Sequence, residues 1–371
     1  MNTRRAFTLV EILTVTVIIS ILVALVTLAV AGAMRAAKRA RIAWAMNQIE
    51  LAIEHYKAEF GEYPPDFFDD DALIRHVRKR WPRFEPPTGD NHDIASKLRH
   101  AMAMVYQNSD FYKQEVLTEW TGQQNPSFNF AEGGADISSL ILWLGGFANP
   151  EGRFEGFSAD PEAPFGRDKA NTINKGDAND VDVNTLKIVA PDKKVFMEME
   201  INKNVFFFNT LGVDQVAPCL GTKFGSKILP IIYFRGSASS GFDPYYDYRD
   251  SPPLGIPTPR IKAYDFSSSS GIPAGGTSPG SEWRDCGVVV PYGKSGIFDA
   301  DPANSTVVWG NPTTYQLIHP GLDGKFGTAE DNQIQSYYRS IGVDPTSALG
   351  SQDLDNLTNF SDYKELKSIL P

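Results

Sequence analysis

The sequence predicts an α+β protein in which one long N-terminal helix precedes a body of mixed helices and strands. An uncharged run of 22 residues extends from Ile12 to Ala33. At 1.5 Å per residue this run covers about 33 Å, enough to cross the hydrocarbon of a bilayer. Apolar residues then recur at spacings of four and three, which is typical of an amphipathic helix. Farther on, within the run Lys194–Ile201, Glu198 and Glu200 alternate with apolar residues in the period of a half-buried strand.

Composition narrows the classes of function. The chain of 371 residues carries a formal charge of −10, which argues against a protein that coats nucleic acid. Five histidines and two cysteines leave few ligands for a transition-metal enzyme. Residues 276–280 match GxSxG by letter but lie in a Ser/Gly/Pro loop, without the strand and helix that a nucleophile elbow needs. We expect no enzymatic activity.

The predicted helix continues beyond the apolar run. Its second part carries an apolar stripe and ends before Gly61, a plausible C-cap, and Pro64-Pro65, which prevent continuation. The stripe consists of Ile42, Met46, Ile49, Ile53, Tyr56 and Phe60. The first part is apolar on all sides and suits lipid or a fibre core, whereas the second must lie against a globular domain.

The charges at the start of the chain predict its orientation. Arg4 and Arg5 precede the apolar run, so this end should stay cytoplasmic while the rest is exported. The run is too long for an ordinary signal peptide, although small residues around Ala31 and Ala33 leave that alternative open. Glu11 opens the apolar run, where a carboxylate is costly, so it is a functional candidate whose partner should be a nearby positive charge.

The segment Arg-Arg-Ala-Phe-Thr-Leu-Val-Glu-Ile-Leu, residues 4–13, resembles the class III prepilin signature of type IV pilins and type II secretion pseudopilins. The resemblance implies cleavage between Ala6 and Phe7 by a prepilin peptidase and N-methylation of Phe7. It also implies that Glu11, the fifth residue of the mature chain, neutralises the Phe7 ammonium of a neighbouring subunit. Ala6 departs from the usual Gly. The stretch Tyr56–Asp66 resembles the junction after the long helix of major pseudopilins.

The resemblance implies a pilin-like α+β fold. Its long N-terminal transmembrane helix would pack on an antiparallel β-sheet that is enlarged by a helical and loop-rich insertion. Residues 1–6 would be the leader, 7–33 the transmembrane half of the helix and 34–61 its periplasmic half. Residues 62–150 would form a mostly helical variable region, 151–310 a loop- and strand-rich insertion, and 311–371 a C-terminal sheet with an acidic loop.

Patterning predicts the elements of this body. We expect helices over Asp71–Trp81, Ile94–Tyr106 and Ile137–Phe147. Besides Lys194–Ile201, we expect strands over Val205–Asn209, Ile228–Phe234 and Tyr315–Ile318.

Two C-terminal segments, His319–Gly327 and Asp353–Phe360, resemble the calcium-binding loop of type II major pseudopilins. The implied cofactor is calcium, which takes six to eight oxygen ligands. The implied ligands are Asp323, Asp353 and Asp355, with carbonyl groups near Leu322 and Lys325. Because residues 328–352 intervene, Asp331 and Asn332 could replace the later pair. The alternative is a solvated acidic turn.

Cys219 and Cys286 are the two cysteines, and both lie in the part predicted to be exported. An oxidising compartment would permit one disulfide between them, but pairing needs Cα atoms within about 7 Å, which the sequence does not decide.

The resemblance implies a structural subunit, a pseudopilin, of a type II secretion-type or type IV pilus-type fibre that supports protein secretion. It would be a single-pass protein of the inner membrane with its body in the periplasm, polymerising with copies of itself and other pseudopilins. Its other partners would be prepilin peptidase and an inner-membrane assembly platform with an ATPase, since the chain has no P-loop. The alternatives are a minor tip pilin or adhesin, and a membrane-anchored exported ligand-binding protein.

Overall fold

The structure is a computed structural model of the full chain. The structure describes residues 9–85, 94–99, 102, 127–128, 134–149, 151–165, 191–209, 215–225, 227–236, 244–247, 260–262, 264–267, 285–295, 307–326, 339–340, 355–362 and 366.

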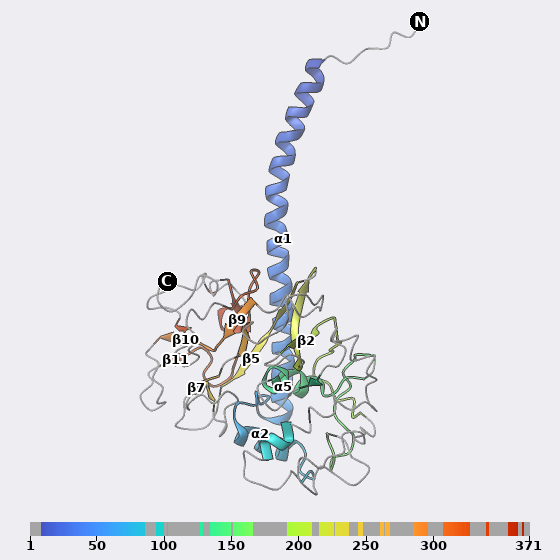
Figure 1. The fold of residues 1–371 in the computed structure, drawn as a ribbon, viewed down its shortest axis with the longest axis vertical. Helices are drawn as coiled ribbons and strands as arrows, with labels where there is room; N and C mark the ends of the chain where they lie inside the picture. The colour runs from blue at the N-terminus through green and yellow to red at the C-terminus, as the bar shows by residue number, and fades with distance from the viewer. Residues whose placement is uncertain are drawn as a thin grey trace.

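Helix α1, Leu9–Phe60, is a single helix of 52 residues, which makes it about 78 Å long. It ends where the sequence predicts. Gly61 has a φ of +74°, and its N–H donates to the Lys57 carbonyl at 2.7 Å, a left-handed cap that glycine adopts without strain. The N-terminal half of α1 stands clear, while the body encloses the C-terminal half (Figure 1).

The strands of the described residues form several small sheets, in which all pairs are antiparallel except β1–β3 and β10–β13. The largest sheet has the order β1-β3-β2, with β4 also paired to β3; its strands are β1 Ser127–Phe128, β2 Val205–Asn209, β3 Gln215–Phe224 and β4 Lys227–Pro230. A second sheet has the order β14-β12-β5, formed by β5 Ile232–Arg235, β12 Tyr315–His319 and β14 Leu357–Thr358. The mixed content and the long apolar helix agree with the predicted α+β pilin-like fold.

The remaining strands pair locally. A third sheet has the order β11-β10-β13, and two further pairs are β6–β7 and β8–β9. Their bounds are β6 Tyr246–Asp247, β7 Arg260–Ile261, β8 Tyr264–Ser267, β9 Asp285–Val289, β10 Tyr292–Ser295, β11 Val308–Trp309 and β13 Arg339–Ser340. A short 3₁₀ helix, η5, covers Asn359–Ser361.

Two shorter helices contribute to the core beside α1. Helix α2, Asp70–Arg80, begins at the N-cap Asp69, whose carboxylate accepts the Ala72 N–H at 2.9 Å. Helix α5, Gly134–Gly145, is buried over 138–145 and contacts α1 and β3. It ends just before Gly146, where a Cβ would lie 2.1 Å from the Gly156 backbone, so that only glycine permits this close approach. Both helices were predicted, and residues 94–99 are helical as well.

Strand predictions were partly wrong. Val205–Asn209 and Tyr315–Ile318 are strands, and Ile228–Phe234 is divided between β4 and β5. Lys194–Ile201 is not a continuous strand; it forms only isolated bridges. Its backbone groups bond several different neighbours: the Met199 carbonyl accepts the Phe154 N–H, and the Ile201 N–H donates to the Gly152 carbonyl. Alternating side chains therefore cover the core without a regular ladder.

Candidate functional site

The N-terminal half of α1 carries the predicted assembly surface. All side chains described between Leu9 and Lys38 are exposed. They include Leu22, Leu25 and Val26, with 55 to 62% of their surface accessible. The helix is long and apolar enough to cross a membrane. The body buries none of its most apolar 18-residue window. An apolar surface of this extent requires lipid or other protein chains around it.

Polar side chains within this half are satisfied by the helix itself. Thr14, Ser20 and Thr27 donate their hydroxyl protons to the carbonyls four residues earlier, at 2.6 to 2.8 Å. Thr16 donates to the Leu13 carbonyl at 2.9 Å. Because a hydroxyl without a partner is costly in hydrocarbon, these bonds suit the helix to a lipid environment.

Glu11 lies in the first turn of α1, where a carboxylate is favoured by the helix dipole. Ala6 and Phe7, the residues of the predicted cleavage, lie outside the described residues. The pairing of Glu11 with the Phe7 ammonium of a neighbouring subunit therefore stays a prediction.

The C-terminal half of α1 is held by packing. Ile42, Met46, Ile49, Ile53 and Tyr56 are buried, with at most 1% of each exposed, which confirms these five positions of the predicted stripe. They belong to one apolar core with residues of α2, α5 and the sheets. Phe60, the last member of the stripe, is half-buried and packs against the same core. Burying such a side chain contributes about 1.5–3 kcal/mol, so the stripe fixes the helix to the body.

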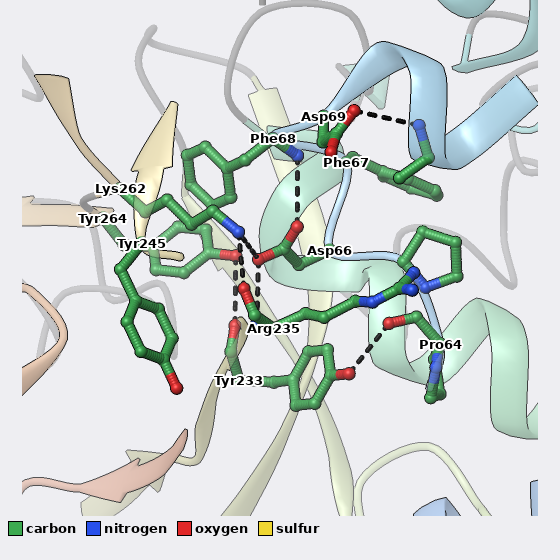
Figure 2. Close-up of polar contacts among 12 residues, drawn as sticks. Pro64, Asp66, Phe67, Phe68, Asp69, Tyr233, Arg235, Tyr245, Lys262 and Tyr264 are labelled. Carbon is green, nitrogen blue, oxygen red and sulfur yellow. Dashed lines mark hydrogen bonds and ion pairs between the residues drawn. The ribbon is translucent and has the colours of Figure 1, made fainter. Parts of the chain in front are cut away.

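A buried ion pair, shown in Figure 2, fixes the position of the segment that follows α1. Lys262 Nζ lies 2.8 Å from Asp66 Oδ2, and the two side chains are 1% and 3% exposed. Asp66 also accepts the Arg235 N–H at 2.8 Å. Lys262 donates in addition to the Arg235 carbonyl at 2.5 Å. The rings of Phe68 and Tyr245 lie 5.7 and 6.0 Å from Nζ. These contacts join the turn after α1 to β5 and to the β7–β8 connection.

A second polar chain joins the end of α1 to α2. The Tyr56 hydroxyl contacts His76 Nε2, and His76 Nδ1 lies 2.9 Å from Glu62 Oε1. Arg80 donates to the Tyr56 oxygen at 3.2 Å. One proton arrangement satisfies all of these contacts: Tyr56 donates to Nε2, and the neutral ring donates from Nδ1 to Glu62.

The charge states in this chain follow from burial. Burial lowers the pKa of His76 to about 4, although Glu62 opposes the shift. Burial alone would raise the pKa of Glu62, but the bond to His76 and the charges of His76, Arg235 and Lys79 lower it to about 2. At neutral pH the chain thus holds a neutral His76 and an ionised Glu62. We call these residues together with the Asp66–Lys262 pair the junction lock: Tyr56, Glu62, Asp66, His76, Arg80, Arg235 and Lys262.

The structure brings together two of the predicted calcium ligands. Asp355 Oδ2 accepts the backbone N–H groups of Leu322 and Asp323, at 2.9 and 3.2 Å. Partial burial and the nearby Asp355 carboxylate raise the pKa of Asp323 to about 6. Asp353, Asp331 and Asn332 lie outside the described residues.

These residues fit a cation in part. Asp355 Oδ1 is buried and has no hydrogen-bond partner in the described part of the chain, and two neighbouring carboxylates favour a positive ion between them. However, the Lys227 ammonium already contacts the Asp323 carbonyl. Among the described residues no group of three or more His, Cys, Asp or Glu side chains could hold a metal ion. A calcium ion would need further oxygen ligands.

Cys219 has a free, buried thiol in the structure. Its Sγ lies 3.2 Å from the Leu220 carbonyl oxygen and 3.6 Å from that of Ile231, and burial raises the pKa of the thiol. Cys286 lies in β9, but its side chain is outside the described residues. The disulfide is not formed at Cys219 in this structure and stays a prediction for the oxidised protein.

Sequence reasoning missed the junction lock. Asp66 belongs to the quoted Tyr56–Asp66 stretch, but its partner Lys262 is 196 residues away, in a segment without a recognisable pattern. The available signal was chemical. An Asp that directly follows two prolines and precedes two phenylalanines enters an apolar region, where it needs a cation.

Comparison with known proteins gives one finding. Residues 1–27 match the model of the family described as the prokaryotic N-terminal methylation motif. The match supports a type IV pilin-like family and indicates a substrate of prepilin peptidase, with fibre assembly in general. Together with the apolar helix it indicates membrane anchoring. No curated protein and no solved structure matches the chain.

Proposed function

We propose that the protein is a structural subunit of a type II secretion-type fibre, a pseudopilin, and that it has no catalytic role. One observation carries the proposal: the methylation motif at residues 1–27 opens a helix whose first half is apolar and exposed. Such a surface is stable in a bilayer as a monomer. It is equally stable against the same half of other subunits, because both environments exclude water from apolar side chains.

In this proposal the chain begins in the inner membrane with its body in the periplasm. Prepilin peptidase removes residues 1–6 and methylates Phe7. An assembly platform and its ATPase then move the subunit into a fibre of like chains and other pseudopilins. The Tyr-Pro-Pro junction and the acidic loop near Asp323 favour the secretion fibre over a pilus. A minor tip position remains the alternative, because the body is large for a repeating subunit.

Glu11 would guide the addition of each subunit. A carboxylate at the edge of hydrocarbon is costly unless it meets a positive charge. A mature chain would offer that charge at its own Phe7 ammonium, four residues from Glu11. An incoming subunit would therefore be most stable at the depth at which its Glu11 meets the ammonium of a neighbour.

The experiment is fibre incorporation of Glu11→Ala. We expect the variant to be cleaved and folded as wild type, because Glu11 lies in the first turn of α1 and the N-terminal end of this helix stands clear of the body (Figure 1), yet to be lost from sheared fibres. Glu198→Ala, which removes an exposed carboxylate of the body, is the control and should assemble normally. Equal incorporation of Glu11→Ala and wild type would overturn the charge-pairing account.

We also propose that the acidic loop binds calcium through Asp323 and Asp355, with further oxygens from the segment after residue 326. The buried Asp355 Oδ1 supports this. In detergent, calcium should raise the melting temperature of the full chain, and Asp323→Ala should reduce that increase. Asp160→Ala, which removes an acidic side chain of another loop, should leave it unchanged. A melting temperature independent of calcium in the wild type would refute the proposal.

A further inference from the structure

A group of basic side chains surrounds α1 where the helix leaves its apolar run. Arg35, Lys38 and Arg41 are exposed, and Arg39 is half-buried. The hairpin between β3 and β4 adds Lys223, which is also exposed. We call these five residues the basic collar.

The hairpin is fixed at the level of the collar. The ring of Phe224, at the end of β3, lies 5.9 Å from Lys38 Nζ and 5.6 Å from Arg41 Cζ, measured to its centre. Such cation–π contacts attract the two basic side chains to the face of the ring. The hairpin and α1 thus share one positively charged end of the body.

The collar begins within the layer of lipid headgroups and extends just beyond it. If residues 12–33 fill the hydrocarbon, Arg35 follows its edge by about 3 Å and Arg41 by about 12 Å. The headgroup layer is roughly 5–7 Å deep on each side. Long basic side chains extend several ångströms along a helix toward such a layer. In Figure 1 this part of α1 is where the helix emerges from the body.

Four residues of the collar carry a positive charge that no described acidic side chain pairs with. Arg35, Lys38, Arg41 and Lys223 form no ion pair with any acidic side chain in the described ranges of the chain. The whole chain carries a formal charge of −10. An anionic surface would therefore repel the parts of the body outside the collar.

The positive-inside rule for membrane orientation does not explain the collar. Positive charges near a membrane span normally mark the cytoplasmic side, and long exported domains cross regardless of their charge. Four basic residues within eight positions of the span, on the exported side, therefore need another partner. A surface of several Lys and Arg beside a bilayer is typical of anionic lipid binding.

We propose that the basic collar binds the headgroups of anionic phospholipids at the exported face of the membrane. This contact holds the body against the bilayer before assembly, and it is broken when the subunit enters a fibre. The inference rests on the membrane insertion in the proposed function, but the lipid preference can be measured independently of fibre formation.

The test is native mass spectrometry of the full chain in detergent with equimolar phosphatidylglycerol and phosphatidylcholine. Wild type should retain phosphatidylglycerol several-fold over phosphatidylcholine, and high salt should remove the preference. The variant Lys38→Gln/Arg41→Gln should lose most of this several-fold preference, since each basic residue contributes substantially near an anionic surface. The matched control Arg78→Gln/Lys79→Gln removes the same two residue types from the exposed side of α2 and should keep it.

Equal retention of the two lipids by wild type would overturn the proposal, as would an unchanged preference in Lys38→Gln/Arg41→Gln. Loss of chain dimers, rather than of lipid, in that variant would also overturn it and assign the collar to a contact between subunits. Alkaline extraction of membranes tests insertion separately. A chain that is extracted as a soluble protein would contradict the proposed function itself.

Discussion

The two halves of α1 are continuous in backbone and opposite in surroundings. Side chains such as Leu22 and Leu25 in the first half are more than half exposed, whereas Ile42, Ile49 and Ile53 in the second half are fully buried. Among the described residues, the body buries no part of the most apolar window of the first half, whereas the second half is fixed by the core and the junction lock. One helix is therefore built for two environments.

This difference separates assembly from folding. Substitutions in the first half should change insertion and polymerisation but leave the unfolding of the body unaltered. Substitutions in the second half, or in the junction lock, should lower the free energy of unfolding. The predictions below use the full chain in detergent and proceed from the largest expected effect to the smallest.

Lys262→Met should cost about 4 kcal/mol of unfolding free energy, because it leaves the buried Asp66 carboxylate without its cation. Denaturant unfolding measures the change. Lys203→Met is the control: the pair of Lys203 with Glu200 is exposed and should contribute less than about 1 kcal/mol. If Lys262→Met were as stable as wild type, the ion pair would not hold the junction.

Ile49→Ala should cost about 3 kcal/mol, through lost burial and the cavity left in the core. Leu51→Ala, two residues away on the same helix, removes a side chain that is 58% exposed and should cost little. Leu22→Ala should leave body unfolding unchanged. A loss at Leu22 comparable with that at Ile49 would contradict the separation of the two halves.

Acid should weaken the junction lock at His76. The unfolded chain takes up a proton there near pH 6.5, while the folded chain resists until about pH 4. The unfolding free energy should therefore fall as the pH decreases between these values, by about 3 kcal/mol from this group. Glu62 loses its contribution only at lower pH, between 4.5 and about 2.

His76→Gln is the variant for this prediction. It keeps a polar side chain toward Tyr56 and Glu62 but cannot titrate. The difference in unfolding free energy between wild type and His76→Gln should shrink as the pH falls from 6.5 to 4. A difference that is independent of pH would show that His76 does not remain neutral in the fold.

The smallest effect is expected at Asp323. Its pKa of about 6 in the fold lies above the ordinary 3.8, so the ionised carboxylate opposes folding above pH 6, and the unfolding free energy should rise as the pH falls from 6 toward 4. Without calcium at pH 7, Asp323→Asn should gain at most about 1 kcal/mol, because the side chain is exposed and solvent screens its charge. Thermal unfolding at the two pH values measures this, and a loss of stability in the variant would contradict it.

The part of the fold that follows from local pattern could be predicted from the sequence. The apolar run, the stripe from Ile42 to Tyr56 and the cap at Gly61 are all set by neighbouring residues, and α2 and α5 were found in the same way. The strand prediction for Lys194–Ile201 was wrong because alternation of apolar and polar residues indicates only that one side of the segment is buried. The ladder depends on distant backbone partners such as Gly152 and Phe154, which periodicity does not encode.

The same distinction between local pattern and distant contacts applies to the candidate site. Glu11 could be singled out because a carboxylate contrasts with the apolar residues around it. Asp323 and Asp355 could be paired through a resemblance, and they do meet in the structure. The junction lock could not be predicted, since Asp66, Arg235 and Lys262 are brought together only by the tertiary fold. Its contacts carry no short-range signal.

The most direct test of the account is mass spectrometry of the N-terminal peptide of the mature protein isolated from membranes. The account predicts a chain that begins at Phe7 and carries an N-methyl group, which would place the exposed half of α1 in a prepilin-processed, fibre-forming subunit. A chain that begins at Gly32 or Met34 would contradict it. The apolar half of α1 would then be a discarded signal peptide, and the body an exported protein without an assembly helix.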